Sequence, residues 1–154
     1  MSEWWVAAGY LYFAVISVVL TVIDVRSHRL PNVIVLPSYL VTAAILTMAC
    51  LTGQPWQSLL RAGIAAVSLF AFYLLFRLID RGWIGGGDVK LAGLLGAYLG
   101  WISGNAVILG VAAAFLCGGL WAAFLLLRRR ANRHTRVAFG PWMILGAWIG
   151  ILLG

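Results

Sequence analysis

The fold is decided by 37 consecutive residues without a charge: residues 91–127 read LAGLLGAYLGWISGNAVILGVAAAFLCGGLWAAFLLL. A helix rises about 1.5 Å per residue, so about 20 apolar residues cross the hydrocarbon core of a bilayer. This stretch is long enough for two crossings, and Ser103, Gly104 and Asn105 mark a turn between them. The sequence therefore predicts two membrane helices here, at about residues 89–103 and 105–127.

The remainder of the chain shows the same apolar pattern. Further runs predict spans at about residues 4–23, 33–51, 58–79 and 137–153. Charged residues make up only 10% of the 154 residues, whereas a soluble domain carries about 25%. Strands of a membrane barrel would instead alternate polar and apolar residues over about ten positions. We predict an all-α, polytopic membrane bundle of about six transmembrane helices, forming a single domain over residues 1–154.

Basic residues orient these predicted spans. Ten of the eleven Lys and Arg residues fall in three loops, at residues 24–32, 77–90 and 128–136. The positive-inside rule places such loops in the cytoplasm. We therefore expect a multi-pass protein of the cytoplasmic (inner) membrane with both termini outside. Basic loops contact anionic lipid headgroups, so the net charge of +7 does not require nucleic acid as a partner.

The four acidic residues of the chain are candidates for a catalytic or ion-binding role. Asp24 ends the first predicted span and Asp88 begins the fourth, which places both at the cytoplasmic edge. Carboxylates near the membrane are costly and are candidates for function. From position alone, helix-end caps or pairs with Arg26 and Lys90 remain equally open. Asp80 lies between basic residues and is interpreted as a charge-balanced loop residue.

Two short motifs surround the span-end aspartates. The first is Asp24-Val-Arg26-Ser-His-Arg-Leu-Pro31-Asn32, and the second is Gly85-Gly86-Gly87-Asp88-Val89-Lys90. Glycines carry no side chain and permit positive φ, so a backbone or an extended substrate could approach the carboxylate closely. A glycine run alone is a weak signal because glycines also form ordinary turns. Its combination with a second span-end aspartate is more specific.

Together these motifs resemble those of the type IV prepilin peptidase family, membrane aspartyl proteases with a Gly-x-Gly-Asp motif. Residues 85–91 resemble that motif and its usual continuation, and Asp24 with Leu30-Pro31-Asn32 resembles the first aspartate and its downstream Pro-Asn. Phe139-Gly140-Pro141 resembles a Gly-Pro that often starts the final span. The resemblance runs from about Asp24 to the end of the chain. It implies a GxGD aspartyl protease-like fold, one peptidase domain, and Asp24 and Asp88 as the catalytic pair.

Supporting roles also follow from this resemblance. Lys90 and Arg26 would tune the charge of the pair, although contact with lipid headgroups is an equal alternative. The implied substrate is a prepilin-like precursor, and the reaction needs no metal or other cofactor. Cys50 and Cys117 each stand alone, without metal-site spacing. The oligomeric state stays open. Expected substrate-binding or supporting residues are Gly85, Gly86, Gly87, Lys90, Pro31, Asn32 and Arg26.

Cysteine content narrows the expected substrate further. Larger members of the family carry a cytoplasmic N-terminal insertion with paired cysteines, which the resemblance links to N-methylation of the cleaved pilin. This chain shows neither such an insertion nor a Cys-x-x-Cys motif. We therefore expect the short, peptidase-only form of Flp/Tad pilus systems, which removes the leader of Flp-type precursors without methyltransferase activity.

Two other functions are compatible with parts of the pattern. In a proton- or cation-coupled small transporter, Asp24 and Asp88 would carry ions and residues 85–105 would form a discontinuous helix. The chain shows no inverted repeat, and its acids lie at one membrane edge, which disfavours this function. A non-catalytic scaffold of a secretion assembly would tolerate loss of either aspartate.

Overall fold

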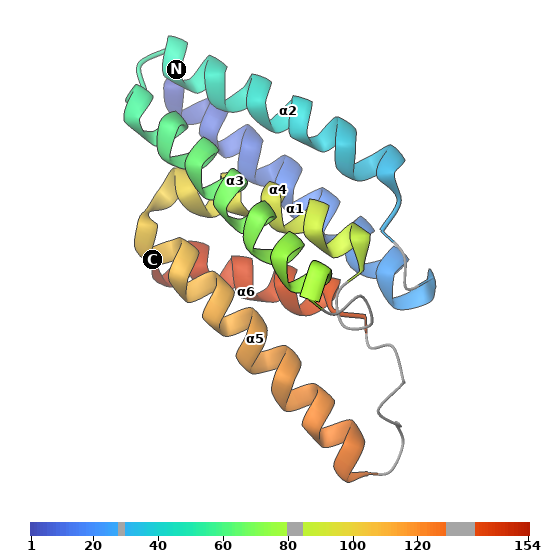
Figure 1. Cartoon of the computed structure of the whole chain (residues 1–154). Helices are drawn as coiled ribbons and strands as arrows, with labels where there is room; N and C mark the ends of the chain where they lie inside the picture. The colour runs from blue at the N-terminus through green and yellow to red at the C-terminus, as the bar shows by residue number, and fades with distance from the viewer. Residues whose placement is uncertain (28–29, 80–84, 129–137) are drawn as a thin grey trace.

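The computed structural model describes residues 1–27, 30–79, 85–128 and 138–154, and all regular structure within these ranges is helical. Four helices, α1, α2, α3 and α5, are long and apolar enough to cross a membrane, and α6 is a shorter apolar helix. The predicted all-α membrane bundle is therefore confirmed (Figure 1). The helices are α1 (Ser2–Ser27), α2 (Asn32–Leu51), α3 (Trp56–Ile79), α4 (Gly86–Ile102), α5 (Gly104–Leu127) and α6 (Gly140–Leu153).

Helix boundaries differ from the predicted spans where the aspartates lie. The first span was expected to end at residue 23, but α1 continues to Ser27, so Asp24 lies inside the helix. Helix α4 begins at Gly86, so most of the glycine run is also helical. Position 137, the expected start of the last span, lies outside the described residues, and α6 starts at Gly140. Both aspartates are therefore held by regular backbone rather than by loops.

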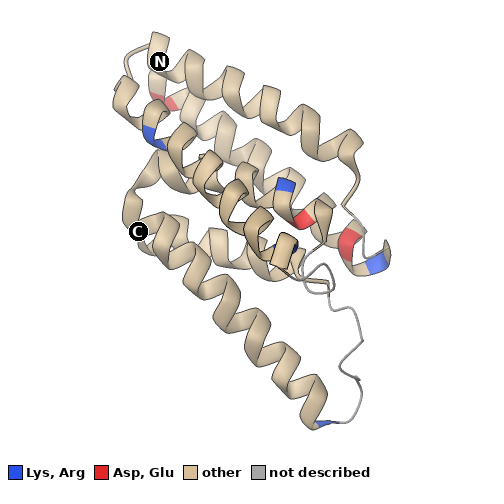
Figure 2. Ribbon diagram, viewed as in Figure 1, with Lys and Arg blue, Asp and Glu red and all other residues tan. Residues whose placement is uncertain are grey.

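Both chain termini lie toward one end of the bundle (Figure 1). At this end, Gln54 in the turn between α2 and α3 donates a hydrogen bond to Glu3, and Ser103 donates one to the carbonyl of Gly154. Charged residues concentrate toward the ends of the helices, as Figure 2 shows. The middle of the bundle is apolar, which is the distribution that a bilayer requires.

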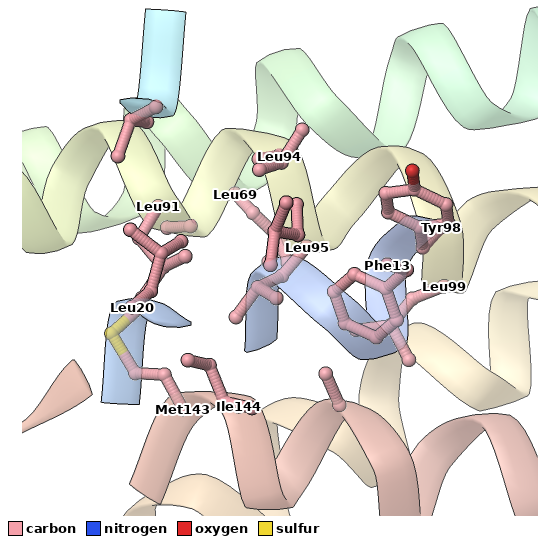
Figure 3. Close-up of a cluster of buried hydrophobic side chains, with 14 of the residues drawn as sticks. Phe13, Leu20, Leu69, Leu91, Leu94, Leu95, Tyr98, Leu99, Met143 and Ile144 are labelled. Atoms are coloured by element: carbon pink, nitrogen blue, oxygen red, sulfur yellow. The ribbon is translucent and has the colours of Figure 1, made fainter. Parts of the chain in front are cut away.

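Helix α4 forms the centre of the molecule. It packs against α2, α3, α5 and α6 and is buried along most of its length. Figure 3 shows leucines of α4 in one cluster with Leu20 and Phe13 of α1 and with Met143 and Ile144 of α6. Because α4 is surrounded by other helices, the residues at its N-terminus are held in place from several sides.

Small residues let α4 approach α3 very closely. A Cβ atom on Gly96 would lie 2.6 Å from the carbonyl oxygen of Ala65, and one on Gly100 would lie 2.5 Å from the Cβ of Ala65. Such contacts between small residues are a usual way for membrane helices to associate. At the C-terminal end of α4, the guanidinium of Arg61 donates hydrogen bonds to the carbonyls of residues 100, 101 and 102. Helices α3 and α4 therefore form a fixed pair.

Gly96→Ala is expected to destabilise this pair by about 1–3 kcal/mol, the usual cost of overpacking a tight interface. The added methyl group would collide with the backbone of α3, which cannot rotate away as a side chain could. Thermal unfolding in detergent micelles measures the effect as a lower midpoint. Gly63→Ala is the matched control, because a Cβ there meets nothing within 4 Å. Equal midpoints for both variants would contradict the packing argument.

Candidate active site

Asp24 extends the buried face of α1 toward one end of the bundle. It lies four residues after Leu20, so both side chains point to the same side of the helix, and Asp24 is only 4% exposed. The amide of Gly140, the first residue of α6, donates a hydrogen bond of 3.1 Å to Asp24 Oδ2. Amides in the first turn of a helix lack partners within the helix and favour a negative charge nearby. The N-terminus of α6 therefore holds the Asp24 carboxylate.

Asp88 is held in the corresponding way by its own helix. It is the third residue of α4, it is 9% exposed, and its Oδ2 accepts a hydrogen bond of 3.1 Å from the amide of Gly85. This arrangement resembles the acidic half of a capping box, in which the side chain at the third helical position binds the backbone of the N-cap. Asp88 thus caps α4 and remains buried.

Electrostatic interaction joins the two aspartates. Burial is the largest influence that disfavours a negative charge on Asp88, the nearby carboxylate of Asp24 disfavours it further, and the guanidinium of Arg77 favours it more weakly. The buried Tyr73, on the same helix as Arg77, also interacts electrostatically with Asp88. Two buried carboxylates that repel one another hold a single proton between them over a range of pH. One end of the bundle therefore contains a carboxylate pair suited to acid–base chemistry.

Neighbouring parts of the chain occupy the space beside the glycine run. A Cβ on Gly86 would lie 2.8 Å from Arg77 Nη1, and one on Gly87 would lie 2.7 Å from the Cβ of Leu30. Gly85 has a φ of −70°, and Gly53 is the one glycine with positive φ in the described ranges. The freedom of glycine to adopt positive φ is therefore not used at 85–87. Arg77, Leu30 and Asp88 pack closely against these three residues, so a side chain at 85–87 would meet one of them.

The model of the type IV leader peptidase family matches residues 11–123, which include both aspartates and the glycine run. The chain belongs to this family. It is 30% identical over 151 residues to a prepilin leader peptidase/N-methyltransferase of Pseudomonas aeruginosa, covering 97% of the chain and 51% of that protein. A protein of the same description from Dickeya chrysanthemi is 33% identical over 141 residues, covering 90% and 48% respectively.

A third such relative, from Aeromonas hydrophila, is 32% identical over 159 residues, covering 100% of the chain and 52% of the relative. The chain thus spans about half the length of these relatives. No solved structure gives a significant match. The family suggested by the motifs is therefore confirmed by the comparisons, while the roles of single residues remain predictions from the motifs and the geometry.

The remaining motif residues of this leader peptidase family member connect α2 to α4. Lys90 Nζ donates a hydrogen bond of 2.9 Å to Asn32 Oδ1 at the exposed surface. The carbonyl of Pro31 accepts hydrogen bonds from the amides of residues 34 and 35 at the start of α2. Tyr39 donates its hydroxyl to the backbone carbonyl of Lys90. These contacts fix the start of α2 beside the start of α4, next to Asp88. Arg26 is exposed in the last turn of α1, where a positive charge suits the helix dipole.

Arg77 and Gly140 interact with the aspartates in the structure, and the sequence did not predict either interaction. Arg77 was counted only among the basic residues of the predicted loop 77–90, and Gly140 was noted only within a motif. For Arg77, the available signal was its spacing of four residues from Tyr73, which places both on one helix face.

Asp80 and the basic residues 129–136 lie outside the described part of the chain. Within the described ranges, no cluster of His, Cys, Asp and Glu could hold a metal ion.

Proposed function

We propose that this chain is a membrane aspartyl endopeptidase that removes the short leader peptide of prepilin-like precursors at the cytoplasmic face of the inner membrane. The observation that carries the proposal is the buried, electrostatically interacting pair Asp24 and Asp88 in a member of the type IV leader peptidase family. Its relatives are described as prepilin leader peptidases, which supports a pilin precursor as the substrate.

The pair supplies both an acid and a base for hydrolysis. With one proton shared between Asp24 and Asp88, the ionised carboxylate accepts a proton from a water molecule, and the oxygen of that water attacks the scissile carbonyl carbon. The neutral carboxyl group donates a hydrogen bond to the carbonyl oxygen and then protonates the leaving amine as the carbon–nitrogen bond breaks. Every proton in this cycle comes from the water or the pair.

The predicted membrane topology supports a cytoplasmic location for this reaction. Asp24 lies in the last turns of α1 and Asp88 in the first turn of α4, whereas Glu3 and Gly154 contact turns at the opposite end. With the basic loops inside, both termini lie outside and the aspartates lie at the inner edge. A precursor whose leader is cytoplasmic and whose apolar helix is in the membrane would present the bond between them at this depth.

The narrower proposal concerns the substrate type. We propose that the precursors are Flp-type and that the chain does not methylate its product, because it contains Cys50 and Cys117 but no Cys-x-x-Cys motif. The relatives are described as N-methyltransferases as well as peptidases, so methylation is the activity in which the proposal separates this chain from them. Mass spectrometry of the processed pilin tests it, since a methyl group on the new N-terminus would add its mass.

The peptidase is tested by reconstituting the protein in liposomes with candidate precursors, including Flp-type ones. Leader removal is followed by gel shift, and the cut is located by mass spectrometry. We expect one cut at the junction of the leader and the apolar helix. Absence of cleavage in every precursor, under conditions where one of the relatives cleaves its own, would overturn the proposal. Proton or cation flux through the same liposomes would then favour the transporter.

A further inference from the structure

Arg77 lies where α3 passes the N-terminus of α4. The tight contact of Gly96 and Gly100 with α3 fixes the two helices side by side. Tyr73, one turn before Arg77, is buried and interacts electrostatically with Asp88. Residues four apart share one helix face, so the face of α3 that carries Arg77 is turned toward Asp88. Arg77 itself is half-buried.

The guanidinium of Arg77 occupies the space left free by Gly86. A Cβ on Gly86 would lie 2.8 Å from Nη1, 3.1 Å from Cζ and 3.3 Å from Nη2 of Arg77. All three are atoms of the charged group rather than of the aliphatic stem. The head of the side chain is therefore directed inward, onto the first residue of α4, instead of extending to lipid headgroups as arginines at span ends often do.

A cation at this position needs a compensating negative charge. The N-terminus of a helix carries a partial positive charge, which disfavours an arginine beside it. Asp88 in the same turn provides the compensation, since Arg77 attracts that carboxylate, although more weakly than burial and Asp24 oppose its charge. The hydrogen bond from the amide of Gly85 also favours the ionised form of Asp88.

The contact of Arg77 with the first turn of α4 affects the charge balance of the Asp24–Asp88 pair. Asp24 and Asp88 with one shared proton carry a single negative charge in a buried site, where an uncompensated charge is strongly disfavoured. Arg77 contributes one positive charge. Of the two cations of the motifs, Lys90 is directed to Asn32 at the exposed surface and Arg26 is exposed in the last turn of α1. Of these three cations, Arg77 is therefore the one placed to neutralise the singly ionised pair.

From this placement, we infer that Arg77 is a positioning residue of the aspartate pair: its guanidinium, seated on Gly86, holds the first turn of α4 and stabilises the singly ionised state. The inference rests on the proposed peptidase function for its consequence in catalysis. Arg77 touches neither the attacking water nor the scissile bond in this scheme, because it acts through Asp88 and through the backbone that carries it.

Arg77→Gln is expected to lower kcat at neutral pH at least about tenfold while changing KM less than about twofold, because the pair and not substrate binding is altered. Removing the nearby positive charge makes ionisation of the pair harder, so the acidic limb of the kcat profile moves up by roughly one pH unit. Arg77→Lys keeps the charge and is expected to restore the position of that limb, with kcat between those of the wild type and the glutamine variant.

Gly86→Ala independently tests the contact between the Arg77 guanidinium and Gly86. The added methyl group would displace the guanidinium, so this variant should reproduce the loss caused by Arg77→Gln. The double variant should then be no slower than the slower single variant, since both changes remove one interaction. Arg128→Gln is the matched control, because it removes the same charge from an exposed residue that contacts Phe124 instead of α4. We expect wild-type kinetics for this control.

A measurement that needs no cleavage separates this inference from the proposed function. Infrared titration follows the protonated carboxyl band of the pair, assigned by its change in Asp88→Asn, in folded wild-type protein and in Arg77→Gln. A titration shifted to higher pH in Arg77→Gln supports the inference even if no precursor is cleaved. An unshifted titration overturns it, and so do losses in Arg77→Gln and Gly86→Ala that multiply in the double variant.

Discussion

Asp24→Asn and Asp88→Asn, each made alone, reduce the rate of leader removal at least about a thousandfold, if the pair acts as acid and base. An amide neither ionises nor shares a proton, so either variant lacks one of the two proton transfers that hydrolysis requires. The loss corresponds to about 4 kcal/mol of transition-state stabilisation, at 1.36 kcal/mol for each factor of ten. The double variant should be no slower than either single variant, because residues that act as a unit are not additive.

The asparagine variants should still fold. The Oδ1 atom of Asn at position 24 can accept the amide of Gly140, and the same replacement at 88 can accept the amide of Gly85. Membrane insertion and thermal unfolding check this. Glu3→Gln is the matched control, because Glu3 is exposed and bound to Gln54 at the opposite end of the bundle. Cleavage that survives in either aspartate variant would show that Asp24 and Asp88 do not act together as the acid and base of this reaction.

The positions of the helices could be predicted because a bilayer leaves few alternatives. An apolar run of about 20 residues must satisfy its own backbone hydrogen bonds in lipid, and a helix does so. Polar loops and glycines then marked the ends to within a few residues. The extension of α1 to Ser27 was missed because Asp24, Arg26 and Ser27 suit a loop as well as a helix end. Local composition does not distinguish these two conformations.

Partners distant in the sequence could not be predicted in the same way. Gly140 lies 116 residues after Asp24, and no periodicity in the chain indicates that α6 begins beside the end of α1. Arg77 posed a related difficulty, because an arginine at a span end can face lipid or protein. Its direction depends on the rotation of α3 against α4, which the contact of Gly96 and Gly100 with Ala65 determines.

The glycine run shows why a correct motif can carry an incomplete explanation. From the sequence, we expected that residues without side chains and free to adopt positive φ would let a substrate or a backbone approach Asp88. In the structure, Gly86 and Gly87 are helical and are packed against Arg77 and Leu30. The absence of side chains is needed, but the closest atoms belong to the chain itself. A motif indicates which residue type is compatible with a position, whereas only the fold shows which neighbouring atoms that residue packs against.

Gly140→Ala is expected to reduce kcat about a hundredfold, although it changes no ionisable group. A Cβ at this position would lie 2.5 Å from Oδ2 and 3.1 Å from Cγ of Asp24. Contact at ordinary van der Waals separation therefore requires the carboxylate or the start of α6 to move by about 1 Å, and a displacement of that size costs on the order of 10²-fold in rate. The cleavage assay in liposomes measures this loss directly.

Its matched control is Gly119→Ala on α5, where a Cβ meets nothing within 4 Å. That variant should cleave at the wild-type rate, so a general effect of alanine in place of glycine in these helices can be separated from an effect at Asp24. Combining Gly140→Ala with Asp24→Asn should add no further loss, because both act on one carboxylate. If Gly140→Ala cleaved like the wild type, the amide of Gly140 would not hold Asp24 during catalysis, and the role assigned to the N-terminus of α6 would be wrong.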